Sequence, residues 1–377
     1  MNQKELSEIV RELPDFDGHE DLVLAEDPSS GLRAIIAVHN TFRGPGVGGT
    51  RMWRYDGERA ALTDALRLSR GMTYKNAISE LPFGGGKAVI MSPEAKSFDR
   101  PGLMRAFGRM VTSLGGRYFT AEDVGTSCDD MEEIRRETEY IFGLRATSGD
   151  PSPHTARGVF LGIQACVEEK FGVSSLDGLR IVVQGVGHVG YHLCALLHEQ
   201  GADLLVTDLN KEALARCEQE FGAKVVAPDR CYDCDADVYA PCALGATVNP
   251  RTLERLKVEV IAGAANNQLE CEEVAEMVRQ KGILYAPDYL INAGGIVNIA
   301  CEMGGKYRPE NAQREVAKIG PRLRQVFARS HAEGSDTLTI ANRMARERFA
   351  PCPEAGGGVA KVSSGLLEKT RLESCPP

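Results

Sequence analysis

The sequence predicts an α/β protein of two domains, and three observations support this prediction. Its 377 residues exceed the size of one ordinary domain. From about residue 150 onward, short apolar segments alternate with helical patterns, as in a doubly wound parallel sheet. The first half has another rhythm, with glycine clusters between strands and helices. We therefore expect a mixed α/β domain over residues 1–149 and a parallel-sheet domain over residues 150–330.

The first half contains clear examples of both periodicities. Ala61, Ala65 and Met72 recur at helical spacing, whereas residues 31–39 form a continuous apolar, β-rich run. The predicted elements, in order, are a strand at 31–39, a helix at 58–79, a strand at 87–91 and a helix at 103–114.

The second half begins after the chain-breaking Pro151-Ser152-Pro153. The predicted helices are 155–170, 188–200 and 211–221, and the predicted strands are 181–184, 203–207, 224–226, 237–239, 258–262 and 283–286. The chain is helical again from Pro309 and has an amphipathic stretch at 336–349. The Gly-, Pro- and Ser-rich tail, residues 351–377, is predicted to be disordered.

Charge and composition exclude several classes of function. The net charge of −9 argues against nucleic acid as a partner, because phosphate binding needs concentrated Lys and Arg. Residues 1–10 lack the basic start and apolar run of a secretory signal, and no apolar stretch approaches the roughly 18–20 residues of a membrane span. We expect a cytoplasmic protein with no membrane partner.

Eleven cysteines are scattered along the chain, and the odd number does not suggest a disulfide framework. Cys231 and Cys234 form a C-x-x-C, but no second pair stands at the spacing of a zinc site. Buried structural thiols are the expected interpretation, and no metal is predicted. A zinc or redox role for Cys231 and Cys234 is the alternative.

Gly185, Gly187 and Gly190 form a G-x-G-x-x-G directly after an apolar strand and at the start of a helix. This context is typical of a Rossmann-type dinucleotide site, in which the helix N-terminus faces the pyrophosphate. Asp208 ends the next strand, where a carboxylate accepts hydrogen bonds from the adenosine ribose and repels a 2′-phosphate. NAD is therefore predicted rather than NADP. A glycine turn that binds nothing is the alternative.

Two lysines in the first half suggest acid–base chemistry. Lys87 directly follows Gly84-Gly85-Gly86, and glycines at this point let a substrate approach the main chain. Lys75 ends a helix that should pack nearby; two buried lysines disfavour each other's protonation, which suits a general base. Asp123 would complete the set. Taken singly, the lysines would be solvated surface groups, and Asp123 an N-cap or turn residue before Gly125.

The chain resembles the family of glutamate, leucine, phenylalanine and valine dehydrogenases, and within it the leucine dehydrogenases most, from about residue 30 to 350. The matching segments are Gly48–Trp53, Gly71–Asn76, Gly84–Lys87, Thr120–Thr126, Pro241–Ala246, Gly263–Asn267, Ala286–Tyr289 and Asn292–Gly295. The resemblance implies a homo-oligomer, with residues 1–149 as a substrate-binding, catalytic and oligomerisation domain and residues 150–330 as a Rossmann-type NAD-binding domain. It also implies a C-terminal helix, residues 331–350, that returns to the first domain.

The resemblance also implies residue roles for the oxidative deamination of an L-amino acid to a 2-oxo acid and ammonia. Lys75 would pair with the substrate carboxylate, Lys87 would activate water, and Asp123 would handle protons at the substrate nitrogen. The implied substrate-binding residues are Lys75, Gly48, Gly49, Val47, Met72, Ala121, Asn266, Ile296 and Ile299. The implied cofactor-binding residues are Gly185, Gly187, His188, Val189, Gly190, Asp208, Thr155, Cys242, Ala264 and Asn292.

The substrate side chain is expected to be apolar. Glutamate-specific relatives carry a lysine and a serine at the positions that Val47 and Ile299 occupy here, so a distal carboxylate would be buried without a partner. Met72, Ala121 and Ile296 complete an apolar wall that suits leucine, isoleucine or valine. A phenylalanine dehydrogenase and a non-catalytic NAD-binding member of the family are the alternatives.

Overall fold

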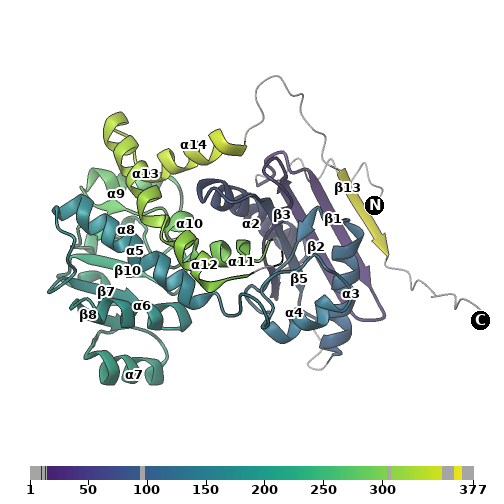
Figure 1. Cartoon of the computed structure of the whole chain (residues 1–377), viewed down its shortest axis with the longest axis horizontal. Helices are drawn as coiled ribbons and strands as arrows, with labels where there is room; N and C mark the ends of the chain where they lie inside the picture. Colours follow the sequence, from purple (N-terminus) through teal and green to yellow (C-terminus); the bar gives the residue numbers. More distant parts are fainter. Residues whose placement is uncertain are drawn as a thin grey trace, which may run out of the picture. The chain divides into compact units, whose positions relative to one another are not determined.

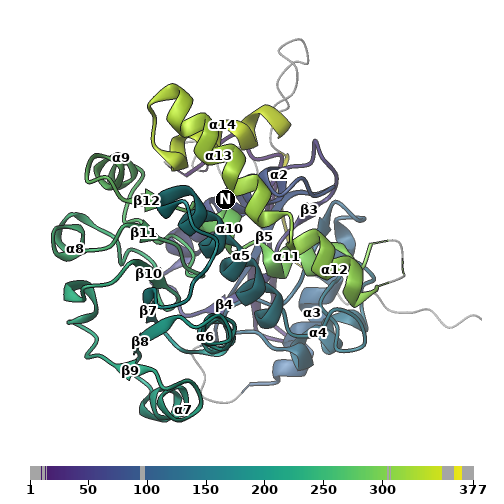
Figure 2. The same cartoon turned by 60° about the vertical axis from the view of Figure 1, so that its left-hand side comes forward.

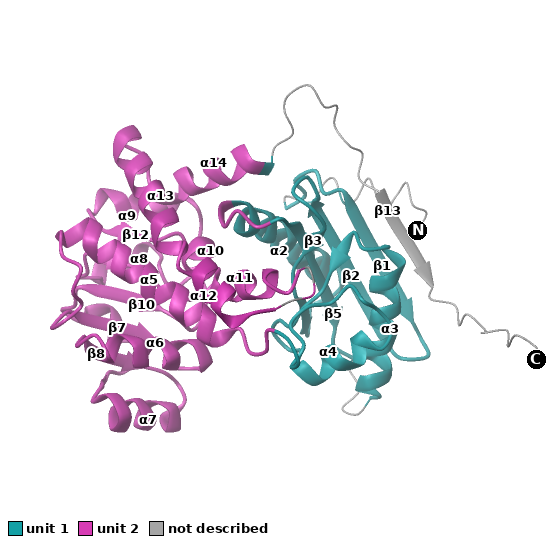
Figure 3. Cartoon of the chain, in the orientation of Figure 1, with its two compact units in different colours: residues 1–77, 82–147, 349–377 teal, residues 78–81, 148–348 magenta. Residues whose placement is uncertain are grey.

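The computed structural model describes residues 10, 13, 15–93, 98–303, 305 and 307–349, together with the backbone of a strand at 361–366. The chain forms two compact units, shown in different colours in Figure 3. Unit 1 contains residues 1–77, 82–147 and 349–377, and unit 2 contains residues 78–81 and 148–348. In the described part of the chain, no helix has the length and apolar character needed to cross a membrane.

Unit 1 is built on a mixed sheet in the order β13-β1-β2-β5-β3-β6, with β4 also paired to β5 (Figure 1). Its strands are β1 (Asp21–Asp27), β2 (Leu32–Asn40), β3 (Gly46–Val47), β4 (Thr50–Trp53), β5 (Gly84–Met91), β6 (Tyr118–Phe119) and β13 (Lys361–Leu366). The β1–β2 and β2–β5 pairs are antiparallel, whereas β3 and β4 pair with β5 in parallel.

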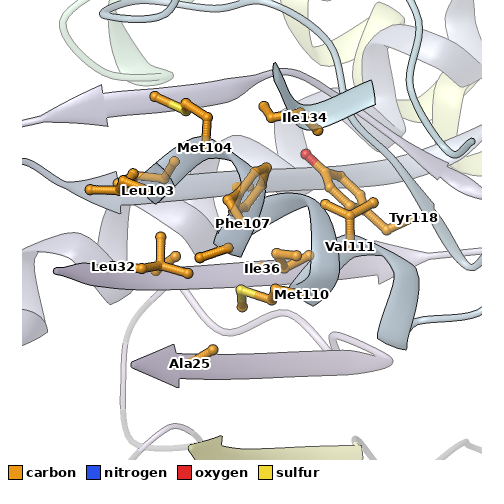
Figure 4. Close-up of a cluster of buried hydrophobic side chains, with 14 of the residues drawn as sticks. Ala25, Leu32, Ile36, Leu103, Met104, Phe107, Met110, Val111, Tyr118 and Ile134 are labelled. Carbon is orange, nitrogen blue, oxygen red and sulfur yellow. The ribbon is translucent and has the colours of Figure 1, made fainter. Parts of the chain in front are cut away.

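Two cores cover opposite faces of this sheet. Helices α3 (Arg100–Ser113) and α4 (Cys128–Arg135) pack with Ile36, Ala88 and Ile90 in one core, part of which Figure 4 shows. Helix α2 (Glu58–Ile78) contributes to the other core, which contains Val89. Alternate residues of a strand point to the same face, so Lys87 lies on the α2 face with Val89.

The glycines before Lys87 serve packing inside unit 1. A Cβ atom added at Gly84 would lie 1.9 Å from the Asn40 carbonyl oxygen. One added at Gly85 would lie 2.1 Å from Thr73 Oγ1, and one added at Gly86 would lie 2.6 Å from the Tyr118 ring. Close packing therefore accounts for these three glycines, and the approach of a substrate to this main chain stays a prediction. Protein atoms fill the space, because α2 and the neighbouring strands approach β5 closely.

A buried histidine also lies on the α2 side of unit 1. His19 Nε2 is 3.0 Å from the Leu66 carbonyl oxygen and 3.1 Å from Ser69 Oγ. Its ring meets that of His39 edge-on, with centroids 4.8 Å apart. Burial, and secondarily His39, lower the pKa of His19 from 6.5 to about 4. The folded protein thus holds this ring neutral at neutral pH.

We expect this histidine to destabilise the protein in acid. Between pH 6.5 and about 4 the unfolded chain binds a proton at His19 that the folded chain does not bind. The free energy of unfolding should therefore fall by about 3 kcal/mol across this window as the pH is lowered. Urea unfolding at about pH 7 and about pH 4.5 should show a smaller difference for His19→Gln than for the wild type; equal differences would contradict the assignment.

Unit 2 contains a six-stranded, all-parallel sheet in the order β12-β11-β10-β7-β8-β9, which Figure 2 shows strand by strand. The strands are β7 (Arg180–Gln184), β8 (Asp203–Thr207), β9 (Lys224–Val225), β10 (Val238–Pro241), β11 (Val260–Ile261) and β12 (Leu284–Tyr285). The chain order reverses between β7 and β10, as in dinucleotide-binding folds. The predicted doubly wound parallel sheet is confirmed.

Helices connect the strands of unit 2. They are α5 (Ser152–Phe171), α6 (His188–His198), α7 (Lys211–Phe221), the 3-10 turn η1 (Cys231–Asp233), α8 (Pro250–Arg255) and α9 (Glu273–Gln280). Four more precede the last one: α10 (Asp288–Ile291), α11 (Gly294–Ala300), α12 (Pro309–Val316) and α13 (Ile319–Glu333). Helix α5 starts earlier than predicted, because Pro153 is accommodated in its first turn.

The last helix, α14 (Thr337–Phe349), differs from its expected assignment. The resemblance places it with the first domain, but its residues through Arg348 belong to unit 2. Thr337 Oγ1 donates to the Tyr285 carbonyl, and Tyr289 donates to Asn342 Oδ1, which explains this assignment. Only Phe349 belongs to unit 1, where its ring meets that of Tyr74 at 5.1 Å.

The tail also departs in part from the expected disorder. Residues 361–366 form β13, whose backbone pairs in parallel with the edge strand β1. An edge strand offers unpaired backbone groups, which accounts for the pairing. Residues 350–360 and 367–377 lie outside the described residues.

Candidate active site

Lys87 makes a buried ion pair. The residue is 5 % exposed on β5, and its Nζ lies 2.9 Å from Oδ2 of Asp123. This placement does not fit a solvated surface lysine. An ammonium group in such a setting needs a carboxylate partner, because an unpaired buried charge costs several kcal/mol.

Asp123 is held by a loop fastened to β4. The Thr50 amide donates to the Ala121 carbonyl at 2.8 Å, and the Met52 amide donates to the Val124 carbonyl at 2.9 Å. Gly125 permits this approach with a φ of +81°, since a Cβ there would lie 1.9 Å from the Met52 carbonyl oxygen. Ser127, not Asp123, caps the following helix α4. The Asp123 side chain is thereby left to face Lys87.

The electrostatics keep Asp123 ionised. Burial alone would raise the pKa of Asp123, but Lys87 and Arg51 together hold it below its usual value. Arg51 Nε donates to the same oxygen, Oδ2, at 3.2 Å. The group of Lys87, Asp123 and Arg51 can therefore bind an amino group and exchange protons with it.

Three predicted substrate residues of unit 1 lie close to this group or to the backbone next to Lys87. A Cβ on Gly48 would lie 1.9 Å from the Gly86 carbonyl oxygen and 3.0 Å from Met72 Cγ, and one on Gly49 would lie 2.8 Å from Asp123 Cβ. Lys75 is half-buried on α2, one helical turn after Met72. Lys75 therefore shares the α2 face of the sheet with Lys87.

Val47 and Ala121, two further predicted substrate residues, are almost fully buried. Val47 exposes none of its surface and Ala121 only 3 %. Val47 sits in β3, paired with both Gly85 of β5 and Phe119 of β6. Neither side chain has a group that could pair with a carboxylate.

In unit 2, the three glycines of the G-x-G-x-x-G have different surroundings. Gly185 has a φ of +97°, and a Cβ on it would lie 2.6 Å from that of Ala243. A Cβ on Gly190 would lie 2.0 Å from the Gly185 carbonyl oxygen, so this glycine lets α6 pack against the strand end. At Gly187 a Cβ would meet no atom within 4 Å. Gly187 therefore borders open space.

The start of α6 is suited to an anion. Gly187 occupies the N-cap position and provides no side-chain cap, so the amides of the first turn, including His188 and Val189, have no capping partner there. A helix N-terminus with free amides and no adjoining side chain is the usual binding place for a pyrophosphate.

Asp208 is positioned by the same loop. Its Oδ2 accepts from the Val186 amide at 2.7 Å and its Oδ1 from the Asn210 amide at 2.8 Å. Each oxygen keeps a second lone pair for a further donor. This pre-set carboxylate at the end of β8 fits two ribose hydroxyls.

Asn292 presents an unused acceptor. It is 4 % exposed, and its Nδ2 donates to the Ala264 carbonyl at 3.1 Å and to Asn266 Oδ1 at 2.8 Å. Within the described part of the chain, its buried Oδ1 accepts no hydrogen bond. Leaving such an atom unsatisfied costs roughly 1–3 kcal/mol. The arrangement fits an amide-bearing ligand such as the nicotinamide carboxamide.

The other predicted residues of unit 2 lie on neighbouring loops and helices. Cys242 follows β10, where its amide donates to the Gln184 carbonyl at 2.7 Å, and burial raises the pKa of its thiol to about 12. Thr155, in α5, lies 2.9 Å from the Cβ position of Gly295. Ile296 and Ile299 lie on α11, each 8 % exposed.

The C-x-x-C of Cys231 and Cys234 is not part of a metal centre in the part of the chain that the structure describes. Among the described residues, no three His, Cys, Asp or Glu side chains come together in a way that could hold a metal ion. Cys231 is buried, its Sγ donates to the Pro228 carbonyl, and burial raises the pKa of its thiol to about 12. A thiol held in this way is a poor nucleophile.

Sequence reasoning missed Arg51, although this residue lies in the Gly48–Trp53 segment. It also missed Tyr118, whose hydroxyl donates to the Gly48 carbonyl at 2.6 Å. An arginine directly after a Gly-Gly-Thr sequence gives no signal of its own. The relevant information is the pairing of β4 with the Asp123 loop, which only the fold provides.

A dinucleotide fold with a buried lysine–aspartate pair defines the class as a nicotinamide-dependent dehydrogenase, and comparison with known proteins identifies its family. Residues 19–140 match the Glu/Leu/Phe/Val dehydrogenase dimerisation domain, and residues 203–355 match the Glutamate/Leucine/Phenylalanine/Valine dehydrogenase domain. The chain belongs to this dehydrogenase family.

Individual relatives cover almost the whole chain. Leucine dehydrogenase of Bacillus subtilis is 49 % identical over 91 % of this chain and 94 % of its own. Leucine dehydrogenase of Thermoactinomyces intermedius is 51 % identical over 88 % and 91 % of the two chains. The crystal structure of L-tryptophan dehydrogenase from Nostoc punctiforme is 44 % identical, covers 91 % of this chain and 98 % of its own, and has a TM-score of 0.78.

Proposed function

We propose that the protein catalyses the reversible, NAD-dependent oxidative deamination of a branched-chain L-amino acid to its 2-oxo acid and ammonia. The buried Lys87–Asp123 pair carries this proposal, because it supplies a base and a proton carrier next to the close-packed Gly48–Gly49 backbone. The leucine dehydrogenases that match over most of the chain support the choice of substrate.

The residues of this chain divide the chemistry among them. Lys75 binds the substrate carboxylate, and Asp123 accepts a hydrogen bond from the substrate nitrogen. Bound NAD would supply the hydride acceptor with which the substrate Cα becomes an iminium carbon. Lys87 then removes a proton from a water that attacks this carbon, and Asp123 carries protons to the nitrogen as ammonia leaves.

The cofactor is proposed to be NAD. The open space at Gly187 and the uncapped start of α6 support pyrophosphate binding there. Asp208 would bind the adenosine ribose and repel a 2′-phosphate, and Asn292 would accept from the nicotinamide carboxamide. Thr155, Cys242 and Ala264 are the further residues proposed to bind the cofactor.

The side-chain pocket is proposed to be apolar, with Met72, Val47, Ala121, Ile296 and Ile299 as its residues. None of them can pair with a carboxylate, so glutamate would lose hydration without compensation. The match of residues 19–140 to a dimerisation domain supports a homo-oligomer, which light scattering of the purified protein would measure.

Initial rates of cofactor reduction test this proposal. L-leucine, L-isoleucine and L-valine should give the highest kcat/KM, with L-glutamate lower by on the order of 10²-fold or more. L-phenylalanine and L-tryptophan belong in the same panel, because an aromatic preference would overturn the branched-chain assignment but not the chemistry. NADP in place of NAD should lower kcat/KM; an equal rate would refute the role of Asp208.

A further inference from the structure

The Asp123 carboxylate is held by one oxygen only. Lys87 Nζ and Arg51 Nε both contact Oδ2, at 2.9 Å and 3.2 Å. No described residue donates a hydrogen bond to the other oxygen, Oδ1. Two cations on one oxygen fix the rotation of the carboxylate and leave the second oxygen for another donor.

Strand pairing places Arg51 beside Lys87. In the β4–β5 ladder Arg51 stands opposite Val89, and Lys87 lies two residues before Val89 on the same face. The amides of Thr50 and Met52, on either side of Arg51, bond to the loop that carries Asp123. The arginine therefore reaches Asp123 from a rigid strand rather than from a mobile surface loop.

Arg51 also contacts a second carboxylate, that of Asp64. Arg51 Nη1 donates to Asp64 Oδ2 at 3.1 Å, and the Tyr55 hydroxyl donates to the same oxygen at 2.7 Å. Arg67 donates to the other oxygen, Oδ1, at 3.0 Å from a mostly exposed position. Asp64 is 9 % exposed and lies on α2, the helix that also carries Lys75. The chain of contacts thus links α2 to Asp123 through Arg51.

We propose that Arg51 is a positioning residue, which with Asp64 and Tyr55 behind it keeps Asp123 ionised and turned so that Oδ1 meets the substrate nitrogen. This inference rests on the proposed role of Asp123 in proton transfer. Arginine suits the task because its planar fork bridges two carboxylates in a fixed geometry, which a lysine cannot do.

Substitution of Arg51 tests the inference through the pH profile as well as the rate. In Arg51→Met, kcat should fall on the order of 10²-fold, because a misplaced carboxylate no longer meets the nitrogen. The acid limb of the kcat profile should move to higher pH, since one of the two cations that favour ionised Asp123 is lost. In Arg51→Lys the acid limb should stay near that of the wild type, while kcat remains low.

Asp64→Asn provides a second variant that leaves Lys87, Arg51 and Asp123 in place. We expect a lower kcat, with the KM for NAD unchanged, because Arg51 loses its ion pair with residue 64. Arg67→Gln is the matched control; it removes only the exposed partner of Asp64 and should keep kcat within about twofold, as exposed ion pairs contribute little.

The outcomes separate this inference from the proposed function. Wild-type kcat and an unmoved acid limb in Arg51→Met and Asp64→Asn, with Asp123→Asn inactive, would overturn the positioning role alone. A lower melting temperature without any change in kcat or in the pH profile would show a purely structural arginine and would also overturn it. Full activity of Asp123→Asn would instead contradict the role in proton transfer that is proposed for Asp123.

Discussion

Replacement of Lys87 by alanine is expected to lower kcat by roughly 10²–10⁴-fold, the contribution typical of a positioned acid–base group. Lys87 is buried on β5 and contacts Asp123 Oδ2 at 2.9 Å, so its loss removes both the base and one partner of the carboxylate. Initial rates with L-leucine and saturating NAD measure the effect.

The control for Lys87→Ala is the affinity for the reduced cofactor, NADH, measured by fluorescence titration. The glycine loop and Asp208 lie in unit 2, whereas Lys87 lies in unit 1, so cofactor affinity should stay within about twofold of the wild type. Near-normal turnover in Lys87→Ala, with the protein folded, would refute the catalytic assignment.

Gly187→Ala is expected to weaken NAD binding without loss of stability, whereas Gly190→Ala is expected to lose stability. A Cβ on Gly187 would meet no protein atom within 4 Å, so the variant should be as stable as the wild type. It should nevertheless raise the KM for NAD about tenfold or more, because the methyl group occupies the space in which the pyrophosphate approaches the backbone. Thermal unfolding and initial rates at varied NAD measure the two effects.

Gly190→Ala should instead destabilise the protein. Its Cβ would lie 2.0 Å from the Gly185 carbonyl oxygen, and backbone on both sides prevents relief. Overpacking of this kind costs about 1–3 kcal/mol and should lower the melting temperature. The account fails if Gly187→Ala binds NAD normally, or if Gly190→Ala is as stable as Gly187→Ala.

The sequence alone predicts much of unit 2, because each of its strands is a short apolar run between helical patterns. Strand β8 and helix α7 have the predicted bounds, residues 203–207 and 211–221. The reason is local consistency: propensity, caps and turn glycines such as Gly222, with a φ of +62°, all specify the same boundaries.

Unit 1 was harder to predict because its sheet depends on contacts between distant residues. Strands β3 and β6 are two residues long and depend on pairing with distant segments: residues 46–47 pair with 84–85 and with 118–119. No periodicity can be seen in so short a segment. The same limit applies to Arg51, because its contact with Asp123 depends on the pairing of β4 with the loop that carries Asp123.

The site residues themselves followed from motifs rather than from geometry. The sequence placed Lys87 and Asp123 in one group, and the structure brings them into contact. Two further contacts depend on the β4–β5 register: the contact of both cations with one oxygen of Asp123, and the contact of Asp64 with Arg51. The spacing of these residues in the sequence does not predict either contact.

The most direct test of the central claim is the stoichiometry of products formed from L-leucine and NAD by the purified chain. We expect equal amounts of reduced cofactor, ammonia and the 2-oxo acid. Binding of NAD without its reduction by any amino acid of the panel would contradict the account and indicate a non-catalytic member of the family.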